Sequence, residues 1–92
     1  MMESSPITRS STKSEEFLPL NEVADLGRFL RVHRKARKLS IHDAAALAGC
    51  SVQFLHDLES GKPTIRMGNA LGYARKLGLE LHMSGPKLDQ AG

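Results

Sequence analysis

The stretch SVQFLHDLESGK, residues 51–62, carries polar side chains at a spacing that suits molecular recognition. Its apolar residues recur every three or four positions, which predicts a helix over residues 51–59. Val52, Gln53 and His56 then project from the opposite side of that helix. An amide and an imidazole both donate and accept hydrogen bonds. These side chains are therefore suited to reading the surface of another molecule.

The remaining reactive residue types do not form a recognisable active site or metal site. Cys50, His42 and His56 come nearest to a zinc set, but one thiol and scattered imidazoles lack the spacing of zinc ligands. The sequence also contains no catalytic triad pattern and no phosphate-binding glycine loop. We expect no metal, no cofactor and no enzymatic activity. A single cysteine cannot form an internal disulfide, which fits a reducing cytoplasm.

Basic residues are concentrated in the middle of the chain. Residues 28–76 contain ten lysines and arginines and three acidic residues, a surplus of seven, whereas the whole chain has a net charge of +3. This asymmetry favours a polyanionic partner. Solubility alone also accounts for it, and the cations of residues 34–38 also suit the negative end of a helix dipole.

The 92 residues predict one small all-α domain. Apolar periodicity predicts helices over residues 22–38, 41–48 and 51–59, and a last helix from residue 64 or 65 to residue 77. Gly49 separates the two short helices, which is the helix-turn-helix arrangement. In that arrangement the outer face of the second helix is the reading surface. Two glycines of the last helix, Gly68 and Gly72, weaken it but could allow close helix packing.

The segment LELHM alternates apolar and polar residues and predicts a short β-strand. A lone strand exposes unpaired backbone groups, and its simplest partner is the same strand of a second copy. We therefore expect a homodimer whose interface is formed by Leu79, Glu80, Leu81, His82 and Met83. The predicted organisation is a disordered arm (1–19), the helix-turn-helix domain (20–78), the dimerising strand (79–83) and a flexible tail (84–92). No apolar run is long enough to span a membrane, and the N-terminal residues lack the pattern of a secretory signal.

The stretch RKARKLSIHDAAALAGCSVQFLHDLESGKPTIRMGNALGYARKLGLELHM resembles the XRE/Cro-type helix-turn-helix repressors. Within that group it is most similar to the HipB-type antitoxins, through LESGKPTIR and ALGYARKLGLELHM. The resemblance covers residues 20–83. It implies a compact, lambda-repressor-like bundle of four or five helices, a homodimer, and repression of its own operon through a palindromic operator in double-stranded DNA. For HipB-type members it also implies a HipA-like serine/threonine kinase toxin as partner.

The resemblance assigns roles to individual residues. It implies operator contacts by side chains of the second short helix, where Gln53 could pair with adenine, Val52 could touch a thymine methyl and His56 could donate to a base or a phosphate. It implies phosphate contacts at the helix N-termini and after the reading helix. It also implies an internal ion pair between Arg34 and Glu59. The implied DNA-binding residues are Ser40, Ser51, Val52, Gln53, His56, Lys62 and Thr64.

The sequence departs from the family pattern in two places. Ile41 occupies a position where a glutamine often contacts phosphate, and the reading helix contains no arginine. More of the specificity is then expected from DNA shape. Two alternatives stay open: a stand-alone regulator without a toxin, and a protein-interaction module that has lost DNA binding.

Overall fold

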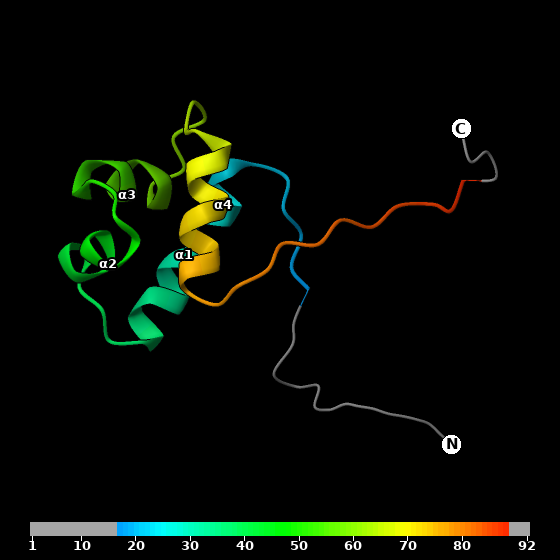
Figure 1. Ribbon diagram of the computed structural model, residues 1–92. Helices are drawn as coiled ribbons and strands as arrows, with labels where there is room; N and C mark the ends of the chain where they lie inside the picture. The colour runs from blue at the N-terminus through cyan, green and yellow to red at the C-terminus, as the bar shows by residue number, and fades with distance from the viewer. Residues whose placement is uncertain (1–16, 89–92) are drawn as a thin grey trace, which may run out of the picture.

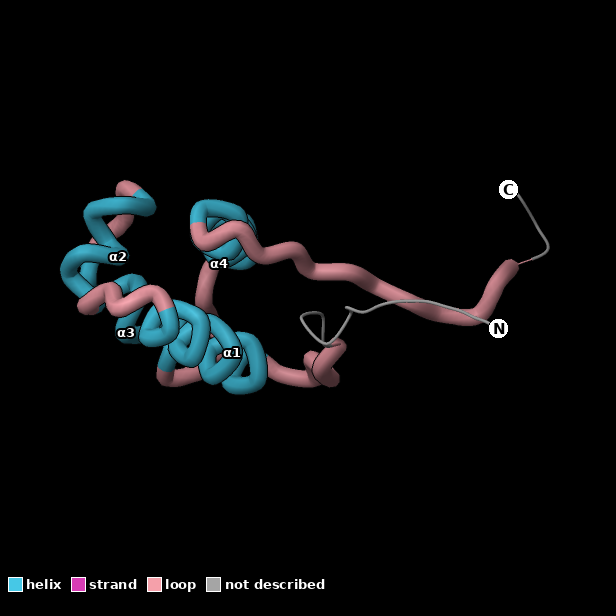
Figure 2. The backbone as a smooth tube through the Cα atoms, turned by 90° about the horizontal axis from the view of Figure 1, so that it is seen from below, coloured by secondary structure: helices cyan, strands magenta, loops and turns pink. Residues whose placement is uncertain are grey.

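The computed structural model describes residues 17–88, and this part of the chain contains four α-helices. They are α1 (Val23–Ala36), α2 (Ile41–Ala48), α3 (Val52–Glu59) and α4 (Met67–Lys76). The all-α prediction and the pair of short helices are confirmed. Both views place α2 and α3 on one side of the molecule and the described segments before α1 and after α4 on the other (Figures 1 and 2). Residues 1–16 of the predicted arm and 89–92 of the predicted tail lie outside the described residues.

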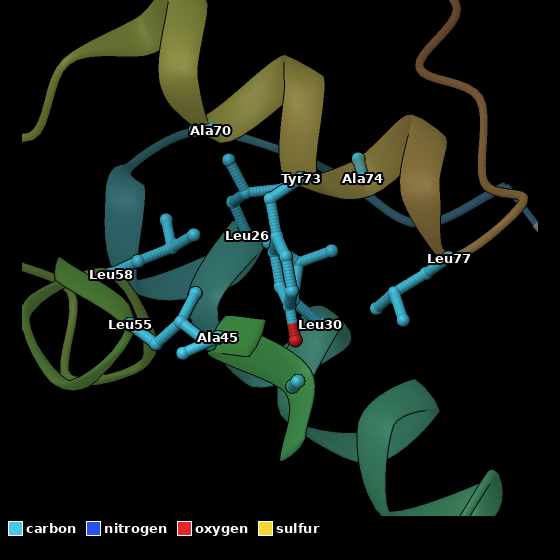
Figure 3. Close-up of a cluster of buried hydrophobic side chains, with 10 residues drawn as sticks. Leu26, Leu30, Ala45, Leu55, Leu58, Ala70, Tyr73, Ala74 and Leu77 are labelled. Atoms are coloured by element: carbon cyan, nitrogen blue, oxygen red, sulfur yellow. The ribbon is translucent and has the colours of Figure 1, made fainter. Parts of the chain in front are cut away.

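The four helices surround one core of leucines, alanines and a tyrosine. The side chain of Tyr73 reaches from α4 across this core toward Leu30 and Ala45 (Figure 3). Small residues on α2 let it approach the other helices closely, since Ala44 and Ala45 are both buried. The buried hydrophobic residues are Leu26, Leu30, Ala44, Ala45, Leu55, Leu58, Ala70, Tyr73, Ala74 and Leu77.

Helix α1 crosses α3 at a glycine that the apolar pattern of the sequence does not single out. A Cβ atom added to Gly27 would lie 2.3 Å from the carbonyl oxygen of Leu58 and 2.8 Å from that of Glu59. The backbones of α1 and α3 are therefore in direct contact at this point. The glycines of α4 have no such role, because a Cβ on Gly68 meets nothing within 4 Å and one on Gly72 meets only Arg75, at 3.9 Å. The close packing that Gly68 and Gly72 could allow is not formed.

Each helix ends with one residue in the left-handed backbone conformation. The φ angles are 59° at Lys38, 70° at Gly49, 83° at Gly61 and 77° at Gly78. At the end of α1, the amide of Leu39 donates to the carbonyl of Arg34 (3.2 Å) and that of Lys38 to Lys35 (2.9 Å). This is the hydrogen-bond pattern of a Schellman motif, which usually places glycine where Lys38 stands. It also explains why α1 ends at Ala36 and does not extend to the predicted residue 38.

Replacing Lys38 with glycine is expected to raise the free energy of unfolding by about 1 kcal/mol, because glycine adopts positive φ without steric cost. Urea denaturation followed by circular dichroism measures the change. Lys38→Ala is the matched control, since it removes the same charge but keeps the Cβ atom. Equal stabilisation by both substitutions would assign the gain to the lost charge and contradict this account.

The hydroxyl of Tyr73 is buried and has no hydrogen-bond partner among the described residues. Burial, together with the nearby carboxylate of Glu59, raises the pKa of Tyr73 to about 12. A buried hydroxyl without a partner loses its hydrogen bonds to water and gains none in return. The tyrosine ring therefore contributes to the core while its oxygen opposes folding.

We expect Tyr73→Phe to stabilise the domain by about 1 kcal/mol or more at neutral pH. The folded pKa lies above the ordinary value of 10, so the wild-type protein should lose stability as the pH rises from about 10 to about 12. The phenylalanine variant should lack that part of the alkaline loss. Tyr73 is the single tyrosine of a chain without tryptophan, so tyrosinate absorbance reports its pKa directly. Destabilisation by Tyr73→Phe would reveal a partner for the hydroxyl.

Two predicted elements differ from the structure. Helix α4 begins at Met67 and not at residue 64 or 65, because residues 62–65 form a turn in which the Ile65 amide donates to the Lys62 carbonyl (3.1 Å). The β-strand predicted over residues 79–83 is not formed. This segment is extended, but a strand requires a paired neighbour, and no described segment of the same chain pairs with it.

Candidate nucleic-acid interface

The starts of α2 and α3 and the turn between these helices are fixed by the local sequence. The Ser40 hydroxyl accepts from the Asp43 amide at 3.0 Å and thereby caps α2. The Ser51 hydroxyl accepts from the Phe54 amide at 3.0 Å and caps α3. Gly49 turns the chain between them, with φ of 70°. Both serines are exposed at the helix N-termini, where the backbone amides that their hydroxyls do not occupy are able to bind phosphate.

Helix α3 has a buried side and an exposed side. Leu55 and Leu58 are fully buried in the core. Gln53 and His56 are exposed, as the helical spacing predicts. Val52 is half-buried and packs against the core, so less of it is free to meet a partner than the sequence suggests. The polar part of the outer face thus consists mainly of one amide and one imidazole.

Asp57 connects two of the predicted contact residues. Its Oδ1 accepts a hydrogen bond from Nε2 of Gln53 at 2.9 Å. Its Oδ2 lies 3.7 Å from Nζ of Lys62, which forms an ion pair. The outer face of α3 and the segment after it are therefore linked by one carboxylate. The spacing alone could have revealed this link, because a glutamine four residues before an aspartate is a known stabilising pair on helices.

The far end of α3 is anchored to α1 by a buried ion pair. Arg34 donates to Glu59 twice, from Nε at 2.7 Å and from Nη2 at 3.0 Å. Its Nη1 also donates to the carbonyl of Leu39 at 2.8 Å. The hydrogen bond with Glu59 raises the pKa of Arg34 above its ordinary value. The structure thus brings together the two residues that the resemblance pairs.

The other predicted phosphate contacts lie at the surface. Lys62 and Thr64 are exposed in the turn after α3, and Ser40 and Ser51 are exposed at the N-termini of α2 and α3. Ile41, which replaces the expected glutamine, is half-buried and packs against the core. The exposed polar groups of this region thus lie at the starts of α2 and α3 and in the turn after α3.

Comparison with known proteins agrees with this geometry. Residues 25–84 match the model of a helix-turn-helix domain family. The chain belongs to that family. Such domains place their second short helix in the major groove of DNA and are a common DNA-binding unit of transcription regulators. This helix-turn-helix protein is accordingly assigned to DNA-binding transcription regulation.

One curated relative has sequence similarity over most of both chains. It is an uncharacterized HTH-type transcriptional regulator, y4mF, of Sinorhizobium fredii, 36% identical over 63 residues. The matched region covers 68% of this chain and 83% of the relative. The likeness supports the family assignment but gives no information on an operator or a protein partner.

Neither a metal site nor an activated thiol is found in the described part of this helix-turn-helix protein. Residues 17–88 contain no group of three or more histidine, cysteine, aspartate or glutamate side chains that could hold a metal ion. Burial raises the pKa of the Cys50 thiol, which disfavours the reactive thiolate. Among the same residues, no helix is long and apolar enough to cross a lipid bilayer.

The segment predicted to dimerise lies away from α3. Leu79 is half-buried against the core, and its amide donates to the carbonyl of Ala74 at 2.9 Å. The next four residues, Glu80, Leu81, His82 and Met83, are exposed. The ring of His82 meets that of Phe17 edge to face, with centroids 6.1 Å apart. The segments before α1 and after α4 therefore lie side by side, on the opposite side of the molecule from α2 and α3 (Figure 1).

Proposed function

We propose that this protein is a sequence-specific transcriptional repressor that binds a palindromic operator as a homodimer. The exposed face of α3, with Gln53 and His56 between two capped helix N-termini and Lys62, is the observation that supports it most directly. On this proposal α3 enters the major groove, and Gln53 pairs with adenine. Ser40, Ser51, Lys62 and Thr64 contact phosphates on either side of the groove. His56 contacts a base or phosphate, and Val52 contacts a thymine methyl with the part of its side chain that is exposed.

The proposal is tested by measuring binding to the DNA upstream of the protein's own gene, against a scrambled duplex, over a range of salt concentrations. We expect a preference of roughly a thousandfold for the operator and a steep loss of affinity with salt. Gln53→Ala should reduce operator affinity by roughly tenfold and leave scrambled binding unchanged. Lys62→Ala should weaken both and reduce the salt slope by about one. Equal, weak binding to both duplexes would instead favour a protein-interaction module.

Dimerisation through residues 79–83 is part of the proposal. The segment is extended and its residues 80–83 are exposed, and among the described residues the backbone amides and carbonyls from Glu80 to Met83 make no backbone hydrogen bonds. Pairing with the same segment of a second copy would satisfy these groups. Two copies would also present their α3 helices to half-sites about one DNA turn apart. Deleting residues 79–92 should give a monomer by light scattering; a shortened chain that remains a dimer would place the interface elsewhere.

We further propose that the repressor is the antitoxin of a HipA-like serine/threonine kinase. Support comes from the resemblance of LESGKPTIR and ALGYARKLGLELHM to HipB-type antitoxins. The test is to co-express the protein with the product of any adjacent kinase-like gene, and to measure growth and kinase autophosphorylation. Relief of growth arrest together with formation of a stable complex supports the antitoxin role. Arrest that the repressor does not relieve supports a stand-alone regulator.

A further inference from the structure

The carboxylate of Asp57 occupies one of the two amide hydrogens of Gln53. A carboxylate only accepts hydrogen bonds, so the nitrogen of the Gln53 amide must face Asp57 and its oxygen must face away. A primary amide has two N–H donors and one carbonyl acceptor. With one donor bound to Asp57 at 2.9 Å, Gln53 retains one donor and one acceptor for a partner.

This remaining pair matches one purine and not the other. In the major groove adenine presents an acceptor (N7) beside a donor (the N6 amino group), whereas guanine presents two acceptors (N7 and O6). A glutamine with one free donor and one free acceptor satisfies adenine. It leaves one acceptor of guanine without a hydrogen bond, which is costly in a desolvated groove.

The other oxygen of Asp57 forms an ion pair that would lower sequence-independent affinity for DNA. It lies 3.7 Å from the ammonium group of Lys62, the proposed phosphate contact after α3. About a quarter of the Asp57 side chain is exposed, and about half of that of Lys62. The carboxylate therefore holds the lysine close to α3 and offsets part of its attraction for phosphates, whatever the sequence.

We propose that Asp57 is a specificity-determining residue, which positions the Gln53 amide to accept adenine and reject guanine and restrains sequence-independent binding through Lys62. The inference rests on the proposed function, because it concerns the same surface of α3. It assigns the role to a residue that need not touch a base. Without the carboxylate, both amide hydrogens of Gln53 are free to bond to N7 and O6 of guanine.

The experiment begins with selection of the operator by the wild-type protein from a randomised duplex library. The base read by Gln53 is the position at which Gln53→Ala loses its preference. At that position we expect the wild-type protein to prefer adenine over guanine by about tenfold or more. Asp57→Ala should reduce this preference to below about threefold and raise the affinity for a scrambled duplex by about threefold or more.

Asp43→Ala is the matched control, since it removes an exposed carboxylate from the same helix-turn-helix unit without touching Gln53. It should keep the preference for adenine. Retention of that preference by Asp57→Ala would overturn the inference and leave the proposed function standing. A wild-type protein that prefers no duplex would instead overturn the proposed function and this inference with it.

A measurement on the free protein tests the contact itself. In nuclear magnetic resonance spectra one side-chain amide proton of Gln53 should resonate further downfield in the wild-type protein than in Asp57→Ala, because it is bonded to the carboxylate. The folding of the variant is checked by circular dichroism. Identical Gln53 amide signals in the two proteins would show that the hydrogen bond does not persist in solution, which would contradict the proposal.

Discussion

Gly27→Ala is expected to destabilise the domain by about 3 kcal/mol. The new methyl group would lie 2.3 Å from a backbone carbonyl oxygen of α3, and no flexible side chain could move aside to relieve the contact. Helix α1 would have to separate from α3, which would disturb the core in which Leu30 of α1 and Leu58 of α3 are buried. A domain of this size has only several kcal/mol of stability in total, so much of the population should unfold. Urea denaturation followed by circular dichroism measures the loss.

The control for this substitution is Gly72→Ala, in α4. The added methyl meets only the end of the Arg75 side chain, at 3.9 Å, and alanine has the higher helix propensity. It should therefore stabilise the protein by up to about 1 kcal/mol. The same chemical change is expected to have opposite signs at the two glycines. Tolerance of alanine at Gly27 would mean that α1 and α3 do not touch at their backbones.

Breaking the pair of Arg34 and Glu59 should have an effect of similar size. Arg34→Leu leaves the Glu59 carboxylate buried without its cation, and also removes the donor to the Leu39 carbonyl. Loss of one partner of a buried ion pair typically costs about 3–5 kcal/mol. Glu59→Leu should cost a comparable amount, because the guanidinium is buried equally well. Thermal unfolding of the variants, checked by urea denaturation, measures both.

The double variant Arg34→Leu with Glu59→Leu separates the attraction between the two side chains from the cost of leaving one charge buried without a partner. Replacing both charges with apolar groups avoids an unpaired ion, so much of the lost stability should return. Arg34→Lys is informative as well, since a lysine cannot reproduce the forked hydrogen bonds to Glu59 and should lose about 2 kcal/mol. Additive losses in the double variant would show that the two side chains contribute independently and would contradict the pairing.

Features determined by local sequence could be predicted. Ser40 and Ser51 indicate the starts of α2 and α3, and Gly49 indicates the turn between them. These features can be predicted because capping depends on neighbouring residues only. The two-sided character of α3 follows from its helical period. The Gln53–Asp57 hydrogen bond is also local, at i and i+4, and could have been recognised from spacing.

Features that depend on packing could not be predicted. Gly27 has no distinguishing neighbours in sequence, and its role arises from the carbonyl groups of a helix thirty residues away. Phe29 fits the apolar pattern of α1 but is half-buried, and its ring lies tilted against that of His33, with ring centroids 4.4 Å apart. The strand predicted over residues 79–83 illustrates the same limit. Alternation of apolar and polar residues indicates which side chains share a face of a segment, but it does not indicate which other segment pairs with it.

On the proposed function, the length of α3 limits how many base pairs of an operator one copy of the protein can read. Eight residues, Val52–Glu59, at 1.5 Å each give a helix about 12 Å long, which spans roughly three or four base pairs. A given sequence of four base pairs recurs by chance about once in every 256 base pairs, which is far too often for a genome with roughly a million or more competing sites. Two such sequences at a fixed spacing and orientation recur about once in 65,000 positions. On the proposed function, the information needed to find an operator therefore exceeds what one α3 can read, so a second copy supplies part of the rest and the shape of the DNA can supply more.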